Sequence, residues 1–154
     1  MSSDINDIIN ELGIELPQLP KPVFSYVPGV ITGKLIYVSG QTPTKDGELV
    51  CKGKVGGELK VEEGYEAAKL AAVNCVAELK LVLGDLNRVV RIVNLSGYVA
   101  SAEGFVQQPA VVNGASDLIV KIWGEQGKHS RKAIGVSELP GGAPVEIELI
   151  AEIK

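Results

Sequence analysis

The last 24 residues constrain the fold most, because they contain two strand patterns separated by a glycine-rich turn. Arg131 precedes a short apolar strand, Ala133–Val136, and a longer strand runs from Val145 to Ile153. Alternation in the longer strand puts its apolar side chains on one face and Glu146 and Glu148 on the other. The pattern predicts a hairpin that brings Arg131 near a carboxylate. An arginine that holds an anion beside a carboxylate that moves a proton can act on a small carboxylic acid.

Two helix patterns lie upstream of this segment. The stronger one, Val61–Leu83, is rich in alanine and ends at Gly84, and a second helix is predicted for Pro109–Trp123. A long β-rich segment, Val89–Ser101, lies between the two helices. The order of strands, helix, strand, helix and strands predicts an α+β fold, a two-layer sandwich of two helices packed on one mixed β-sheet. We expect the final strand to lie at an exposed edge that oligomerisation covers.

The N-terminal part begins with a short predicted helix. Ser3 or Asp4 can cap a helix over Ile5–Leu12, which ends at a glycine. Three prolines then favour an extended connector, and Val23–Val27 has the composition of a strand.

A hairpin and a turn-rich segment follow the connector. The hairpin joins Val30–Thr32 to Leu35–Ser39 through a two-residue loop that begins with glycine. The segment Gly40–Lys60 is turn-rich, with one short strand expected near Leu49–Cys51. We expect one domain over residues 1–154, with residues 1–22 as an N-terminal extension.

Composition excludes several classes of protein. The chain has 154 residues, a net charge of −4 and a pI near 5.1, which argues against a protein that grips nucleic acid through bulk charge. It shows neither a secretory signal nor an apolar run of membrane-spanning length. Cys51, Cys75 and the single histidine, His129, lack metal-ligand spacing. We therefore expect a cytoplasmic protein with reduced thiols, no membrane contact and no metal.

Each candidate site residue has an ordinary structural explanation as well. Arg131 lies in a basic segment that fits either a solvated loop or an anion clamp, for which its planar fork is suited. Glu146 and Glu148 fit the wet face of a strand, or one of them has a raised pKa in a partly buried cleft and acts as an acid or base. Ser39 ends a strand, where its hydroxyl can reach a cleft or bond to the backbone.

Three sequence blocks in a fixed order resemble one family. The first is Tyr26–Val30 and the second Ile36–Pro43; the closing block contains Arg131, Leu139–Pro140 and the strand from Val145 to Ala151. Together they resemble the YjgF/RidA family of reactive enamine/imine deaminases, some of which are called endoribonuclease L-PSP. The resemblance runs from about residue 23 to the C-terminus.

The resemblance implies a chorismate-mutase-like fold and a homotrimer with three clefts between subunits. It implies that Arg131 holds the carboxylate of the substrate and that Glu146 positions or activates water. The residues that it places around the ligand are Tyr26, Ser39, Asn113 and the backbone at Ala133.

The function that the resemblance implies is hydrolysis of 2-imino acids, or their 2-enamine tautomers, to 2-oxo acids and ammonia without a cofactor. One alternative is a non-catalytic trimer that binds small carboxylic acids, and a weaker one is an endoribonuclease. The N-terminal extension, Thr42–Val61 and Ser101–Pro109 depart from the family's common pattern, and Ala133 stands where cysteine is frequent. These departures indicate a divergent branch and leave the choice of substrate open.

Overall fold

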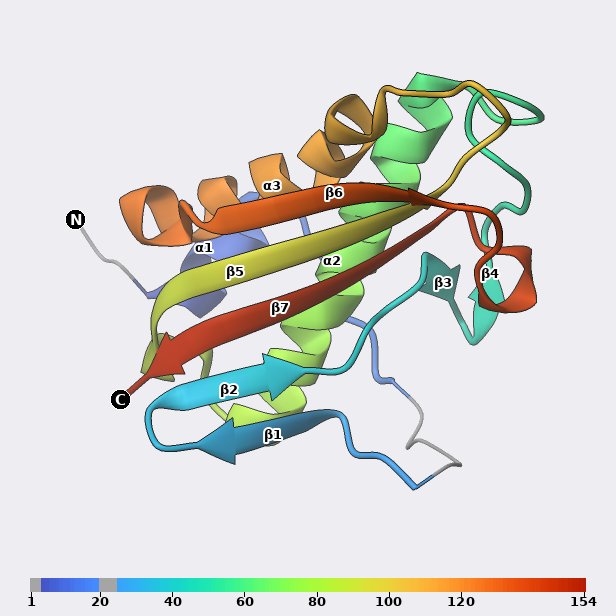
Figure 1. Cartoon of the computed structure of the whole chain (residues 1–154). Coiled ribbons are helices and arrows are strands. Elements are labelled where there is room, and N and C mark those ends of the chain that lie inside the picture. Colours follow the sequence, from blue (N-terminus) through green and yellow to red (C-terminus); the bar gives the residue numbers. More distant parts are fainter. Residues whose placement is uncertain (1–3, 20–24) are drawn as a thin grey trace.

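The computed structural model describes residues 4–19 and 25–154 (Figure 1). The strands are β1 (Gly29–Thr32), β2 (Leu35–Val38), β3 (Thr44–Lys45), β4 (Glu48–Leu49), β5 (Val89–Ala100), β6 (Ser130–Val136) and β7 (Val145–Ile153). The α-helices are α1 (Ile5–Glu11), α2 (Val61–Leu83) and α3 (Gln108–Trp123), and short 3-10 turns are η1 (Leu86–Arg88), η2 (Gly124–Gly127) and η3 (Pro140–Gly142).

Five strands form one sheet in the order β1-β2-β7-β5-β6. The β5–β6 pair is parallel and the other pairs are antiparallel, so the sheet is mixed, as predicted. Figure 1 looks onto the open face of the sheet, and the two long helices cover the far face. The predicted two-layer α+β fold is confirmed, with α1 as a third, short helix beside α3 and η1.

Helix α2 forms the centre of the second layer. Its side chains from Ala71 to Leu79 are buried on every side, which suits its small residues because the helix lies between the sheet, α3 and the neighbouring loops. It ends at Gly84, whose φ of +78° favours glycine. Among the described residues, neither α2 nor any other helix combines the length and apolarity that crossing a membrane requires.

The C-terminal hairpin prediction is wrong, because β5 lies between β6 and β7. Strand β5 has 12 residues and pairs with β6 on one side and β7 on the other. The final strand is therefore central rather than an exposed edge, and β1 and β6 form the edges. The connection through η3 carries the chain across β5 instead of turning it back beside β6 (Figure 1).

The N-terminal predictions have mixed outcomes. Asp4 caps α1, since its carboxylate accepts from the backbone N–H groups of Asn6 and Asp7, while Ser3 lies outside the described residues. Within the strand predicted for residues 23–27, Val23 and Phe24 also lie outside the described residues, and residues 25–27 form no strand.

The hairpin prediction is confirmed by β1 and β2, which are joined at Gly33 with a φ of +58°. The turn-rich segment forms a small second hairpin rather than one short strand. Its two strands, β3 and β4, are joined by Asp46 and Gly47, which both have positive φ.

Candidate functional site

The six residues predicted to line the site fall into two groups within one chain. The first group is at the outer edge of β6, where Arg131 and Ala133 lie beside Asn113 of α3. The second group lies away from β6, where Tyr26 precedes β1, Ser39 follows β2 and Glu146 is the second residue of β7.

Arg131 is held at an exposed corner between β6 and α3. Its Nη1 donates to Asn113 Oδ1 at 2.8 Å and to Ser116 Oγ at 3.2 Å. Among the described residues, no hydrogen bond is made by Nη2 or Nε. The corner therefore fixes one edge of the guanidinium and leaves donors for an anion. Ala133 lies two residues further on the same face of β6 and packs against the core.

His129 supports this corner through Ser116. Its Nδ1 lies 2.6 Å from Gly127 O, an acceptor, so Nδ1 carries the proton. The Ser116 hydroxyl then donates to His129 Nε2 at 3.0 Å. This leaves the lone pairs of the Ser116 oxygen to accept from Arg131. Burial lowers the pKa of His129, and the nearby charge of Arg131 lowers it further, so the neutral form is favoured.

Glu146 lies partly buried on the open face of the sheet. Burial raises the pKa of its carboxyl group, and the neighbouring Glu148 raises it further. Gly40 permits this position, because an added Cβ there would lie 2.5 Å from Glu146 Oε2. Glu148 accepts a hydrogen bond of 2.9 Å from the Tyr98 hydroxyl. Glu146 thus has the environment of a group that exchanges protons nearer neutral pH than an exposed glutamate does.

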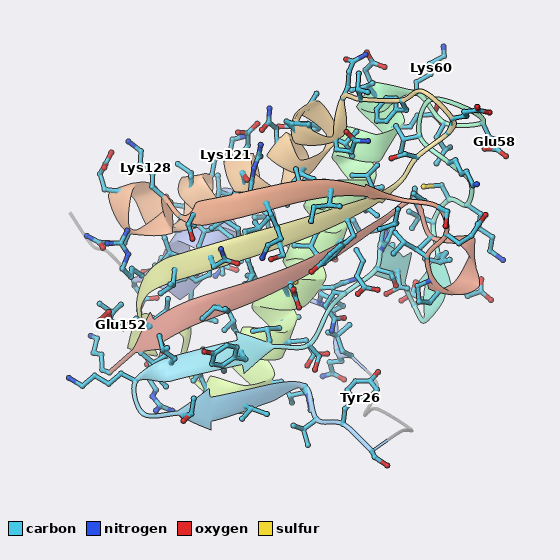
Figure 2. All side chains as sticks on the ribbon, viewed as in Figure 1. Tyr26, Glu58, Lys60, Lys121, Lys128 and Glu152 are labelled. Carbon is cyan, nitrogen blue, oxygen red and sulfur yellow. The ribbon has the colours of Figure 1, made fainter. Side chains whose placement is uncertain are left out.

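Ser39 and Tyr26 line the pocket beside this carboxylate. The Ser39 hydroxyl donates to Val27 O at 2.6 Å, which is the structural role expected of a hydroxyl at a strand end. Tyr26 is 53% exposed and precedes β1, as labelled in Figure 2. Both residues belong to a pocket of about 870 Å³ that Gly40 also lines.

The two groups cannot meet within one chain. Arg131 pairs with Leu95 and points to the helix side of the sheet, where it contacts α3. Glu146 pairs with Tyr98 and points to the open side, two strands away. The predicted hairpin contact between Arg131 and Glu146 is therefore absent, because β5 separates their strands and their side chains leave opposite faces.

Sequence reasoning missed the residues that support the two groups. No motif marks Ser116 or His129. Ser116 lies three residues, about one helical turn, after Asn113 on α3, and His129 lies two residues before Arg131, so both are near the corner. Glu148 was identified as a neighbour of Glu146 but not as a cause of its raised pKa.

Neither cysteine has the environment of a nucleophile. Cys75 is fully buried, its Sγ donates to Ile147 O at 3.2 Å, and burial raises the pKa of its thiol well above the ordinary value. Burial also raises the pKa of Cys51, with the charge of Glu63 as a smaller cause. Within residues 4–19 and 25–154, no group of three or more histidine, cysteine, aspartate or glutamate side chains is placed to hold a metal ion.

Comparison with known proteins gives consistent relatives over nearly the whole chain. TCP17 of Trypanosoma cruzi is 42% identical over 94% of this chain and 91% of its own length. Among solved structures, Atu1372 of Agrobacterium tumefaciens, of unknown function, is 44% identical, covers 99% of this chain and 93% of its own, and has a TM-score of 0.89. TdcF of E. coli, solved with bound serine, is 21% identical over 88% of this chain and 93% of its own; its TM-score of 0.60 shows a shared fold.

A family profile also matches residues 7–153, with the description "YjgF/chorismate_mutase-like, putative endoribonuclease". This match covers both groups of predicted site residues and all five strands of the main sheet. With the family profile matched over most of its length and relatives above 40% identity, the chain belongs to the YjgF/chorismate mutase-like family.

Proposed function

We propose that this protein hydrolyses 2-imino acids, or their 2-enamine tautomers, to 2-oxo acids and ammonia. The observation that carries the proposal is the pair of half-sites: a held arginine with spare donors, and a partly buried glutamate with a raised pKa. Family membership supports it, and the bound serine in TdcF shows that this fold accommodates a small amino acid in that protein.

Arg131 binds the substrate carboxylate in this proposal. Asn113 and Ser116 restrict Nη1, so the remaining N–H groups face outward in a defined plane. A planar guanidinium matches a carboxylate with two parallel hydrogen bonds, which fixes the position of the adjacent imine carbon.

Glu146 moves the proton. Its carboxylate takes a proton from water as the oxygen attacks the iminium carbon, forming a carbinolamine. The same proton then passes to the nitrogen. As the C–N bond breaks, the Glu146 carboxylate takes the hydroxyl proton, the C=O bond forms and ammonia leaves; the carboxyl group then returns that proton to ammonia, which departs as ammonium. The atoms balance with one water consumed per imine, and a carboxyl group with a raised pKa suits both directions of transfer.

A second copy of the chain must supply the other half of each site, because Arg131 and Glu146 leave opposite faces of one sheet. The open face has the character of an interface. Apolar side chains remain exposed on it, with Val30 at 53%, Tyr37 at 44% and Ile134 at 44%. A face of this kind usually marks an association site.

The first prediction concerns assembly. We expect light scattering to give a mass three times that of the 16.2 kDa chain. Ile134→Glu places a charge on the open face and should dissociate the trimer and abolish turnover. Leu81→Glu is the matched control, because Leu81 is 56% exposed but lies on α2, away from that face. A wild-type mass near 16.2 kDa would remove the shared site.

The second prediction concerns pH. Since the charge of Glu148 helps to raise the pKa of Glu146, Glu148→Gln should lower that pKa. The acid limb of the kcat/KM profile should move to lower pH, because Glu146 then loses its proton at lower pH. Glutamine keeps an oxygen that can accept from Tyr98. An unchanged or upward-shifted acid limb would argue that another group controls it.

The alternative function is carboxylic-acid binding without catalysis, since the Arg131 corner alone suffices for that. Measured turnover of freshly generated 2-iminopropanoate or 2-iminobutanoate separates the two. Ammonia release above the spontaneous rate supports the enzyme, whereas tight 2-oxobutanoate binding with no acceleration supports the binder.

A further inference from the structure

A carboxylate that the proposed reaction does not use lies in the wall of the pocket that Tyr26 and Ser39 line. The pocket of about 870 Å³ is lined by residues of the connector Pro17–Leu19, of the chain before β1, and of the segment from Ser39 to Gly47. Helix α2 contributes Glu78 to the lining. Glu146 does not line this pocket, although Gly40 lies beside both.

Glu78 is only half satisfied. The residue is 4% exposed, and its Oε1 accepts from Gln41 Nε2 at 3.3 Å. Its Oε2 is buried and has no hydrogen-bond partner among the described residues. Buried carboxylate oxygens in folded proteins are nearly always partnered, so this one calls for a donor.

A second unpartnered acceptor lies one helical turn away. Asn74 is fully buried, and its Nδ2 donates to the backbone oxygens of Thr42 and Thr44, both at 3.0 Å. These bonds fix the amide, and its Oδ1 has no partner among the described residues. Residues four apart share a helix face, so the two acceptors lie on one side of α2, but only Glu78 of the pair lines the pocket.

The pocket has the charge of a cation site. Its described lining includes the carboxylates of Glu78 and Asp46 and no lysine, arginine or histidine. Burial raises the pKa of Glu78, as expected of a carboxylate without a cation beside it. The remaining wall is partly hydrocarbon, from Pro17, Leu19 and Pro28.

We propose that this pocket binds a primary aliphatic ammonium group, with its nitrogen against Glu78 and its hydrocarbon chain along the proline and leucine wall. A primary ammonium has three N–H donors and so can serve several acceptors at once, as a lysine side chain does. A water molecule could donate to the same oxygens but would leave the carboxylate charge without a counter-charge. The pocket shares Tyr26 and Ser39 with the proposed reaction site, but the ammonium would lie against Glu78, to which imine hydrolysis assigns no role.

The test is calorimetric titration of the full-length protein at neutral pH with n-butylammonium, and with n-butanol as a neutral analogue of similar shape. We expect saturable binding of the ammonium and much weaker binding of the alcohol. Glu78→Gln keeps the shape and removes the charge, and should weaken ammonium binding about tenfold or more. Asp46→Asn removes an exposed carboxylate at the rim and should have a smaller effect.

Several outcomes would overturn the proposal. Equal affinity in wild type and Glu78→Gln would remove Glu78 from the site, and equal affinity for butylammonium and butanol would remove the charge requirement. Absence of any ammonium binding would mean that Glu78 is satisfied within the protein, for example as a neutral acid. A cooperative thermal transition of Glu78→Gln with a midpoint near that of wild type would establish that the variant is folded. Arg131→Ala should still bind butylammonium, which separates this site from the proposed reaction.

Discussion

Replacing Arg131 with alanine is expected to remove most imine turnover and to weaken binding of 2-oxobutanoate. The guanidinium makes the contact that selects a carboxylate, and each charge-assisted hydrogen bond is worth about 1.5–3 kcal/mol. Losing one such bond lowers affinity or turnover roughly ten- to a hundredfold. Arg131→Lys should recover only part of this loss, because an ammonium cannot make the paired, planar contact. Steady-state kinetics and titration with 2-oxobutanoate measure both effects.

The control for Arg131 is Lys128→Ala, which removes one positive charge nearby. Lys128 is exposed and pairs with Glu125 at 2.7 Å, and Figure 2 shows it pointing away from the sheet. It should leave turnover and binding unchanged. The fold should survive in both variants, because Arg131 is an exposed residue of the edge strand β6. Wild-type behaviour of Arg131→Ala would reject both the enzyme and the acid-binding alternative at this corner.

Local sequence signals predicted the secondary structure well where they were strong. The predicted helix over Val61–Leu83 matches α2 at both ends, because an alanine-rich segment is followed by a glycine with positive φ. Alternation in Val145–Ile153 predicted the two faces of β7, with apolar side chains in the core and Glu146 and Glu148 outside.

Strand order could not be read from the same signals. The sequence pattern of β6, a turn and β7 fits a hairpin as well as it fits two strands separated by a third. The structure decides between them, because β5 pairs with both β6 and β7. Pairing depends on contacts between residues far apart in sequence. For that reason the sequence, through the family resemblance, offered candidate residues for a site but placed Arg131 and Glu146 too close together within one chain.

Glu78 was invisible for a different reason. It interrupts a run of small apolar residues in α2, and a single charged residue in a helix is usually assigned to the solvent-exposed side. Helix α2 is buried on every side at this level, and the loop after β2 covers the side that carries Glu78 and Asn74. The available signal for a polar site on this helix was the spacing of Asn74 and Glu78, which are four residues apart within that run.

Replacing Glu146 with glutamine is expected to abolish proton exchange while leaving carboxylate binding nearly intact. Glutamine keeps the size of the side chain beside Gly40 but cannot take a proton from water. Removing a general base typically costs about 10²–10⁴ in rate, so kcat should fall in that range and the acid limb of the pH profile should disappear. Full activity in this variant would move the role to Glu148 or to water alone.

Stability provides an independent readout of the same variant. Because burial raises the pKa of Glu146 in the folded state, the stability that this group contributes is present at low pH and is lost as pH rises through the raised pKa. Glu146→Gln should therefore be at least as stable as wild type at neutral pH, with no gain at low pH. Glu152→Gln is the matched control, since Glu152 lies on the same face of β7, near its C-terminal end (Figure 2). The Glu152→Gln variant should change neither turnover nor the pH profile. If Glu146→Gln were inactive because it is unfolded, its thermal midpoint would be lower than that of wild type.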